Sequence, residues 1–158
     1  MKICMFVSND LINDPRVTRH AESLGKSGHS VLVICTKSNR TAYVEKREFY
    51  SVRRSEQTCY KRLEKIVSSR SRKRRVPREE SSSVSPSSTK RFITSLYGSL
   101  AYLFFFFDMT WRFFKLGREF NAHVYVSNDL DTLLAGVLCA RASRKLIHDA
   151  HEMFSDQL

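Results

Sequence analysis

Residues 2–35 read KICMFVSNDLINDPRVTRHAESLGKSGHSVLVIC. Lys2 to Val7 is an apolar run without alternation, which is typical of a strand that is covered on both faces. Asp14 and Pro15 suit the cap and the first position of a helix, and the apolar residues that follow are spaced for one helical face. Val31 to Cys35 is a second β-branched run. The stretch therefore predicts a βαβ unit at the start of a parallel sheet.

The alternation of strand and helix continues further along the chain. His123–Val126 is predicted as a third strand, Thr132–Ala142 as a helix of small residues and Lys145–His148 as a fourth strand. Thr41–Arg54 is charged and loosely alternating, which suits an exposed strand or hairpin at the edge of the sheet. With 158 residues, 42% of them hydrophobic, the chain fits one α/β domain (residues 1–158) with a Rossmann-like parallel sheet and flanking helices.

The pentapeptide VSNDL occurs twice, at Val7–Leu11 and Val126–Leu130, each time at the end of a predicted strand. Carboxyl ends of parallel strands lie at one edge of a sheet, where ligands bind. Ordinary turn and helix-capping chemistry explains the repeat equally well. Arg16, on the first helix, is either solvated or a contact for a phosphate or carboxylate.

The net charge of +11 is concentrated in one segment. Lys61–Arg91 holds 11 Lys or Arg against three Glu, which leaves only +3 for the rest of the chain. Residues 68–90 combine this charge with a serine-rich run and too little apolar area to offset the entropy of ordering, so they predict a disordered loop.

An uncharged, aromatic run of 16 residues follows at Phe92–Phe107. It is short for a membrane span, which needs about 20 apolar residues, and predicts a long, partly buried helix over Arg91–Arg118. Basic residues beside exposed aromatics favour the surface of an anionic membrane, whereas packing of the aromatics on the sheet is the alternative. The residues expected to contact such a membrane are Arg72, Arg74, Arg75, Phe105, Phe106 and Trp111.

Metal, dinucleotide and secretory signals are missing from the sequence. The four cysteines show no zinc spacing, and His148–Glu152 does not match a zinc motif, so we expect buried free thiols and no metal site. The first loop lacks the glycines of a dinucleotide site. Because the apolar run at the N-terminus is too short for a signal peptide, we expect a cytoplasmic protein, peripheral at the inner face of the membrane if the basic segment binds lipid.

Three blocks of sequence resemble the amino-terminal domain of retaining glycosyltransferase family 4. The first is Asp14-Pro15-Arg16-Val17 with Arg19 and Leu24–His29, and the others are Asn128–Gly136 and His148–Phe154. Together they cover about half of the chain, in the order and spacing of the family.

The resemblance implies one half of a GT-B architecture, in which this domain holds the acceptor and a second domain, absent here, holds most of the nucleotide-sugar donor. His151 falls on the active-site histidine motif of the family, and Asp10, Asn128 and Asp129 line the acceptor side. The implied activity is hexosyl transfer to a polysaccharide or lipid-linked glycan in polysaccharide biosynthesis, with the nucleotide sugar as substrate and no other cofactor. The first loop departs from the Gly-Gly version of many members. We expect negligible turnover from the chain alone, because donor positioning needs both walls of the cleft.

Two other functions stay open. One is a non-catalytic module that uses the basic segment to bind an anionic membrane, a nucleic acid or a protein partner. The aromatics are not interleaved with the basic residues, which argues against nucleic acid. The other is a GT-B epimerase. The sequence makes no prediction of oligomeric state.

Overall fold

The computed structural model describes residues 1–56, 88–141 and 144–150, with side chains from residue 102 onward in the second range. The chain divides into two compact units, residues 57–108 and the remainder, which we describe separately. The elements in chain order are β1 (Lys2–Phe6), α1 (Pro15–Lys26), β2 (Ser30–Thr36), β3 (Val44–Lys46), β4 (Tyr50–Ser55), α3 (Ser88–Phe120), β5 (Val124–Ser127), α4 (Leu130–Cys139) and β6 (Lys145–His148).

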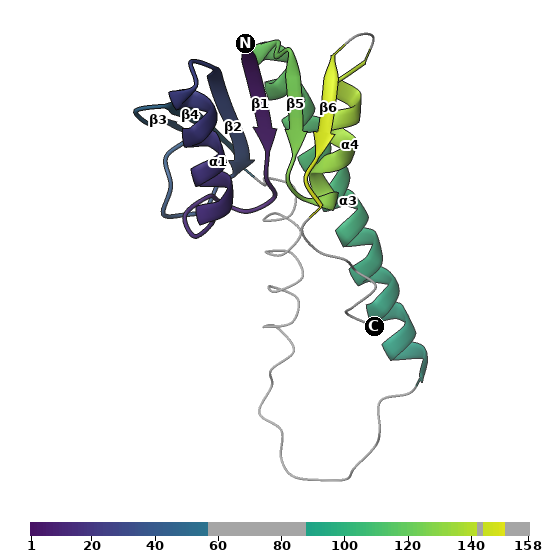
Figure 1. The fold of residues 1–158 in the computed structure, drawn as a ribbon. Helices are drawn as coiled ribbons and strands as arrows, with labels where there is room; N and C mark the ends of the chain where they lie inside the picture. Colours follow the sequence, from purple (N-terminus) through teal and green to yellow (C-terminus); the bar gives the residue numbers. More distant parts are fainter. Residues whose placement is uncertain (57–87, 142–143, 151–158) are drawn as a thin grey trace. The chain divides into compact units, whose positions relative to one another are not determined.

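The larger unit is built on a six-stranded sheet in the order β3-β4-β2-β1-β5-β6 (Figure 1). β3 is antiparallel to β4, and the other pairs are parallel, so the predicted α/β class with a mostly parallel sheet is confirmed. From β1 the chain adds β2 and β4 on one side of that strand, and it later adds β5 and β6 on the other side. The direction in which successive strands are added therefore reverses between β1 and β5, and in open α/β sheets ligands bind at such a position.

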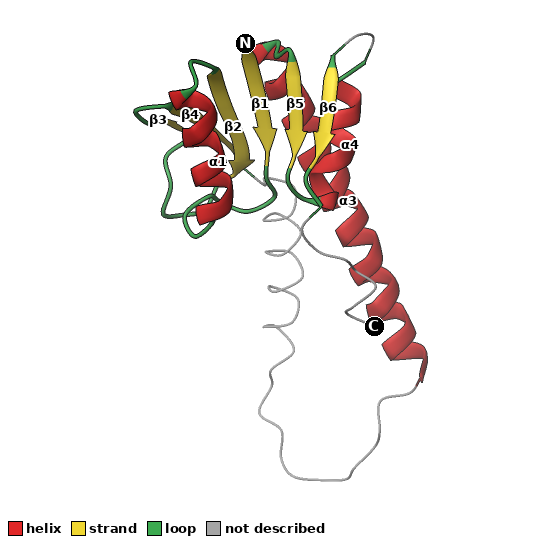
Figure 2. Ribbon diagram, viewed as in Figure 1, coloured by secondary structure: helices red, strands yellow, loops and turns green. Residues whose placement is uncertain are grey.

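Helices cover both faces of the sheet (Figure 2). On one face, Val17 and Ala21 of α1 are buried with alternate residues of β1, β2, β4 and β5. On the other face, Phe6 stacks between Phe113 of α3 and Tyr125 of β5, with ring centroids 6.0 Å apart in each pair. Burial of large apolar side chains on both faces explains why the β1 and β2 sequences show no alternation.

The predicted edge hairpin is present as β3 and β4, but β4 is less exposed than its charged sequence suggested. β4 pairs in parallel with β2, and Tyr50, Val52 and Arg54 are buried.

Two helices predicted from the sequence are present, but their ends differ by a few residues from the predicted ones. α3 extends to Phe120 and is followed by Asn121 in the left-handed region (φ 57°), a usual way to end a helix. α4 begins at Leu130 and ends at Cys139, earlier than predicted.

Three of the cysteines are buried free thiols, as predicted, while Cys59 lies outside the described residues. Burial raises the pKa of Cys35 to about 12 and that of Cys139 to about 11, so both thiols are protonated at neutral pH. A protonated, buried thiol is a poor nucleophile and a poor metal ligand. These cysteines therefore belong to the core.

In the smaller unit, the structure describes Ser88–Asp108 of α3. The predicted disordered loop lies outside the described residues except for Ser88–Lys90, which are helical. Tyr102, Leu103, Phe104 and Phe107 are exposed, whereas Phe105 and Phe106 are half-buried. Among the described helices, none has the length and hydropathy to cross a membrane.

Candidate functional site

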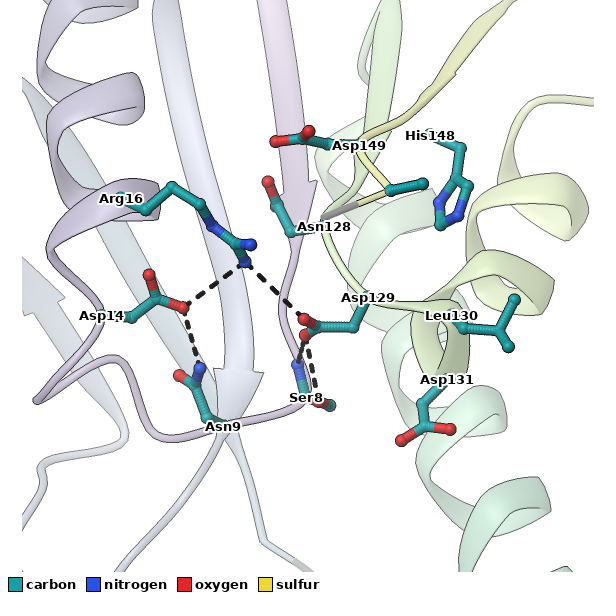
Figure 3. A pocket seen from close by; sticks show the side chains of 11 residues that line it. Ser8, Asn9, Asp14, Arg16, Asn128, Asp129, Leu130, Asp131, His148 and Asp149 are labelled. Carbon is teal, nitrogen blue, oxygen red and sulfur yellow. Dashed lines mark hydrogen bonds and ion pairs between the residues drawn. The ribbon is translucent and has the colours of Figure 1, made fainter. Parts of the chain in front are cut away.

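A pocket of about 750 Å³ opens at the carboxyl ends of β1, β5 and β6, where the direction of the connections reverses. Most of its lining residues carry a charge or a hydrogen-bonding group, as Figure 3 shows. They are Ser8, Asn9, Asp14, Arg16, Asn128, Asp129, Leu130, Asp131, His148, Asp149 and Ala150. The two VSNDL segments thus face one pocket, together with the residues that follow β6.

Side by side in the sheet, the two VSNDL copies are not aligned residue for residue, because the pairing of β1 with β5 shifts one copy by two residues relative to the other. Phe6 lies level with Ser127 in the β1–β5 pairing, so Ser8 reaches the level of Asp129. The Ser8 backbone N–H donates to Asp129 Oδ2 at 2.7 Å, and the Ser8 hydroxyl donates to the same oxygen at 3.0 Å. The second copy therefore supplies the carboxylate that fixes the first loop, while Asp10, at the equivalent position of the first copy, lies two residues further on.

Asn128 lines the pocket and is held by the main chain of β1. Its backbone N–H and its side-chain Nδ2 both donate to the Phe6 carbonyl, at 3.1 and 3.0 Å. The residue is 2% exposed, and within the described part of the chain its Oδ1 is buried without a hydrogen-bond partner. Since Nδ2 is fixed by Phe6, the orientation of this acceptor is fixed as well.

Arg16 extends from the first turn of α1 toward two carboxylates (Figure 3). One of its terminal nitrogens lies 3.8 Å from Asp14 Oδ2 and 3.7 Å from Asp129 Oδ1. Asp14 is itself held by Val17 N–H at 3.1 Å and by Asn9 Nδ2 at 2.9 Å. Arg16 Nε is buried and has no hydrogen-bond partner in the described region. The guanidinium therefore lies within ion-pair distance of two carboxylates, while its Nε–H donor makes no hydrogen bond in the described region.

Asp10 does not line the pocket, although the family resemblance implied a place for it on the acceptor side. Its carboxylate accepts from Ile12 N–H at 3.1 Å within its own turn. The next residue, Leu11, is 1% exposed and adopts a left-handed backbone (φ 63°), which is rare for a bulky residue. The turn is thus shaped by Asp10 and anchored in the core by Leu11.

Arg54 holds the turn at Asp10 through a hydrogen bond to its main chain, and the sequence did not predict this role. Its side chain is 1% exposed and donates to the carbonyls of Asp10 and Ala42, at 3.3 and 3.1 Å. It also pairs with Glu45 at 2.8 Å. The only available signal was an arginine pair within an otherwise strand-like run, Tyr50–Ser55.

Of the other residues singled out in the sequence, some lie outside the described part of the chain, one is exposed on α3 and one lines the pocket. His151, Arg72, Arg74 and Arg75 lie outside the described residues. Trp111 is 55% exposed, with Lys115 Nζ 5.1 Å from its ring centroid. His148 lines the pocket, and its Nδ1 lies 3.2 Å from the Ser127 carbonyl.

The described residues contain no group of three or more His, Cys, Asp or Glu side chains arranged to hold a metal ion. What the pocket offers instead is a set of carboxylates, one guanidinium and a fixed amide. Such a set recognises a ligand through directed hydrogen bonds. Comparisons of the chain with protein-family profiles, curated proteins and solved structures find no match.

Proposed function

We propose that this chain forms the acceptor-binding wall of a sugar-transferring enzyme of GT-B architecture, with a Rossmann-like topology. The observation that carries the proposal is the polar pocket at the reversal between β1 and β5, built from both VSNDL segments and the end of β6. The second of these segments and the end of β6 also belong to blocks that resemble retaining glycosyltransferase family 4, at Asn128–Gly136 and His148–Phe154. In that architecture the nucleotide sugar lies mainly on a second domain, so we assign the acceptor to this pocket.

The pocket chemistry supports a carbohydrate ligand. Sugar hydroxyls both donate and accept, and the pocket presents carboxylate and amide acceptors beside guanidinium and hydroxyl donors. These groups would orient an acceptor hydroxyl, while the opposite wall would stabilise the departing diphosphate electrostatically. No covalent role for a pocket residue is needed in this proposal.

Binding of simple glycosides to the purified chain tests the proposal. In saturation-transfer NMR, we expect signals from members of a panel of methyl hexosides, and Asp129→Asn should weaken the affinity about five- to tenfold, or about 1 kcal/mol. The substitution preserves an oxygen for Ser8 but removes the charge that faces Arg16. Glu119→Gln, at an exposed site on α3, is the matched control. A panel without any bound member would contradict the proposed function.

A second proposal concerns the smaller unit, where α3 would contact an anionic bilayer. Tyr102, Leu103, Phe104 and Phe107 expose 49 to 66% of their surface within two turns of helix. A cluster of exposed aromatics on a helix is typical of membrane-interface binding, and the net charge of +11 favours anionic lipid.

Phe104→Ser with Phe107→Ser is expected to reduce co-sedimentation with phosphatidylserine-containing vesicles at least fivefold. Val44→Ser, at a site of equal exposure (66%) on β3, should leave it unchanged. Binding that is insensitive to both salt and the double substitution would exclude a bilayer contact through α3.

A further inference from the structure

Two residues that line the pocket each have a buried hydrogen-bonding atom without a partner in the described part of the chain. Asn128 Oδ1 is an acceptor and Arg16 Nε is a donor. A ligand that satisfies both recovers hydrogen bonds that the empty pocket lacks. Sugar hydroxyls can donate to an acceptor such as the first and accept from a donor such as the second, whereas the oxygens of a carboxylate or of a dianionic phosphate can only accept.

The charges around Arg16 also discriminate between ligands. Its guanidinium lies between the carboxylates of Asp14 and Asp129, at 3.8 and 3.7 Å, so two negative charges surround one positive charge. Both carboxylates are held in place by hydrogen bonds from Val17, Asn9 and Ser8. An anion placed against Arg16 would therefore lie close to two fixed carboxylates, and an uncharged group would not suffer that repulsion.

We infer that the pocket selects an uncharged, hydroxyl-bearing sugar and rejects acidic or phosphorylated sugars. The inference rests on the proposed function and specifies the class of acceptor. It assigns Arg16 a hydroxyl ligand, in place of the phosphate or carboxylate that the sequence left open. In this assignment Asn128 Oδ1 accepts a hydrogen bond from a sugar hydroxyl, and Arg16 donates one to a sugar hydroxyl oxygen.

The test compares matched ligands at one ionic strength by NMR titration of the purified chain. The probes are methyl hexosides of gluco, manno and galacto configuration, the corresponding methyl hexuronides, the hexose 6-phosphates and inorganic phosphate. We expect the best methyl hexoside to bind at least tenfold more tightly than its hexuronide or 6-phosphate. If an anionic probe binds equally well or more tightly, the inference is wrong while a sugar site remains. If no sugar binds at all, the proposed function itself fails.

Arg16→Gln tests the assigned contacts. It removes the Nε donor and the charge, and we expect the hexoside affinity to fall at least fivefold, with hexuronides still excluded. Arg19→Gln is the control, because Arg19 lies on the same helix and contacts only the Pro15 carbonyl, at 3.3 Å, in the described structure. Equal losses for the two variants, or tighter hexoside binding by Arg16→Gln, would overturn the role of Arg16. The circular dichroism spectrum of each variant separates these results from unfolding.

Discussion

Gly25→Ala should lower the free energy of unfolding by about 3 kcal/mol, measured by chemical denaturation. A Cβ atom at this position of α1 would lie 2.1 Å from the Phe49 carbonyl oxygen and 2.7 Å from the Phe49 Cβ. Because the obstacle is backbone, a side-chain rotation cannot relieve the clash, and either α1 or the turn before β4 must move. The gain in helix propensity of about 1 kcal/mol is too small to offset this.

Gly28→Ala provides the contrast within the same segment. Gly28 has φ 80° and open space where a Cβ would stand, so the cost is only the left-handed backbone, about 1 kcal/mol. The two variants thus separate steric contact from backbone strain. A Gly25→Ala variant as stable as Gly28→Ala would show that α1 does not approach Phe49 so closely.

The second large effect is expected from Arg54→Met, which should cost about 3 kcal/mol. The substitution keeps most of the apolar stem but removes the bonds that the buried guanidinium donates to the carbonyls of Asp10 and Ala42 and to Glu45, and hydrogen bonds from a charged group contribute about 1.5 to 3 kcal/mol each. Glu45 keeps its bond from Arg47, at 2.7 Å, so the loss does not arise from an orphaned carboxylate.

Arg53→Met is the matched control one residue earlier in β4. Arg53 pairs with Glu119 at 2.9 Å, but its side chain is 39% exposed and that of Glu119 64%. Exposed pairs of this kind contribute less than about 1 kcal/mol. Thermal melts of both variants, read as shifts in Tm, should rank them clearly. Equal shifts would mean that Arg54 does not anchor the loop.

The sequence predicted the strands and helices of the larger unit well, because burial on both faces leaves continuous apolar runs and α1 has clear start signals. Its errors lie at helix ends, where local signals are weak. The burial of β4 was not predicted because the strand contains charged residues. Arg54 can be buried because its guanidinium donates hydrogen bonds to the carbonyls of Asp10 and Ala42. Those contacts depend on tertiary structure and leave no local pattern in the sequence.

The candidate site was predictable in part. Three residues that the sequence singled out line the pocket: Asn128, Asp129 and Arg16. A fourth, Asp10, does not line it. The pentapeptide alone suggested that Asp10 and Asp129 are equivalent. Their environments differ because the strand register offsets the two copies by two residues, and register is set by pairing between strands far apart in the chain.

The backbone of Leu11 bears on how the pocket responds to a ligand. A left-handed conformation at a bulky residue is intrinsically unfavourable, and here the burial of the leucine side chain in the core compensates for it. The loop cannot change shape without withdrawing Leu11 from the α1 face of the sheet. This side of the pocket is therefore preorganised, and a ligand that binds to it should lose little affinity to ordering of the loop.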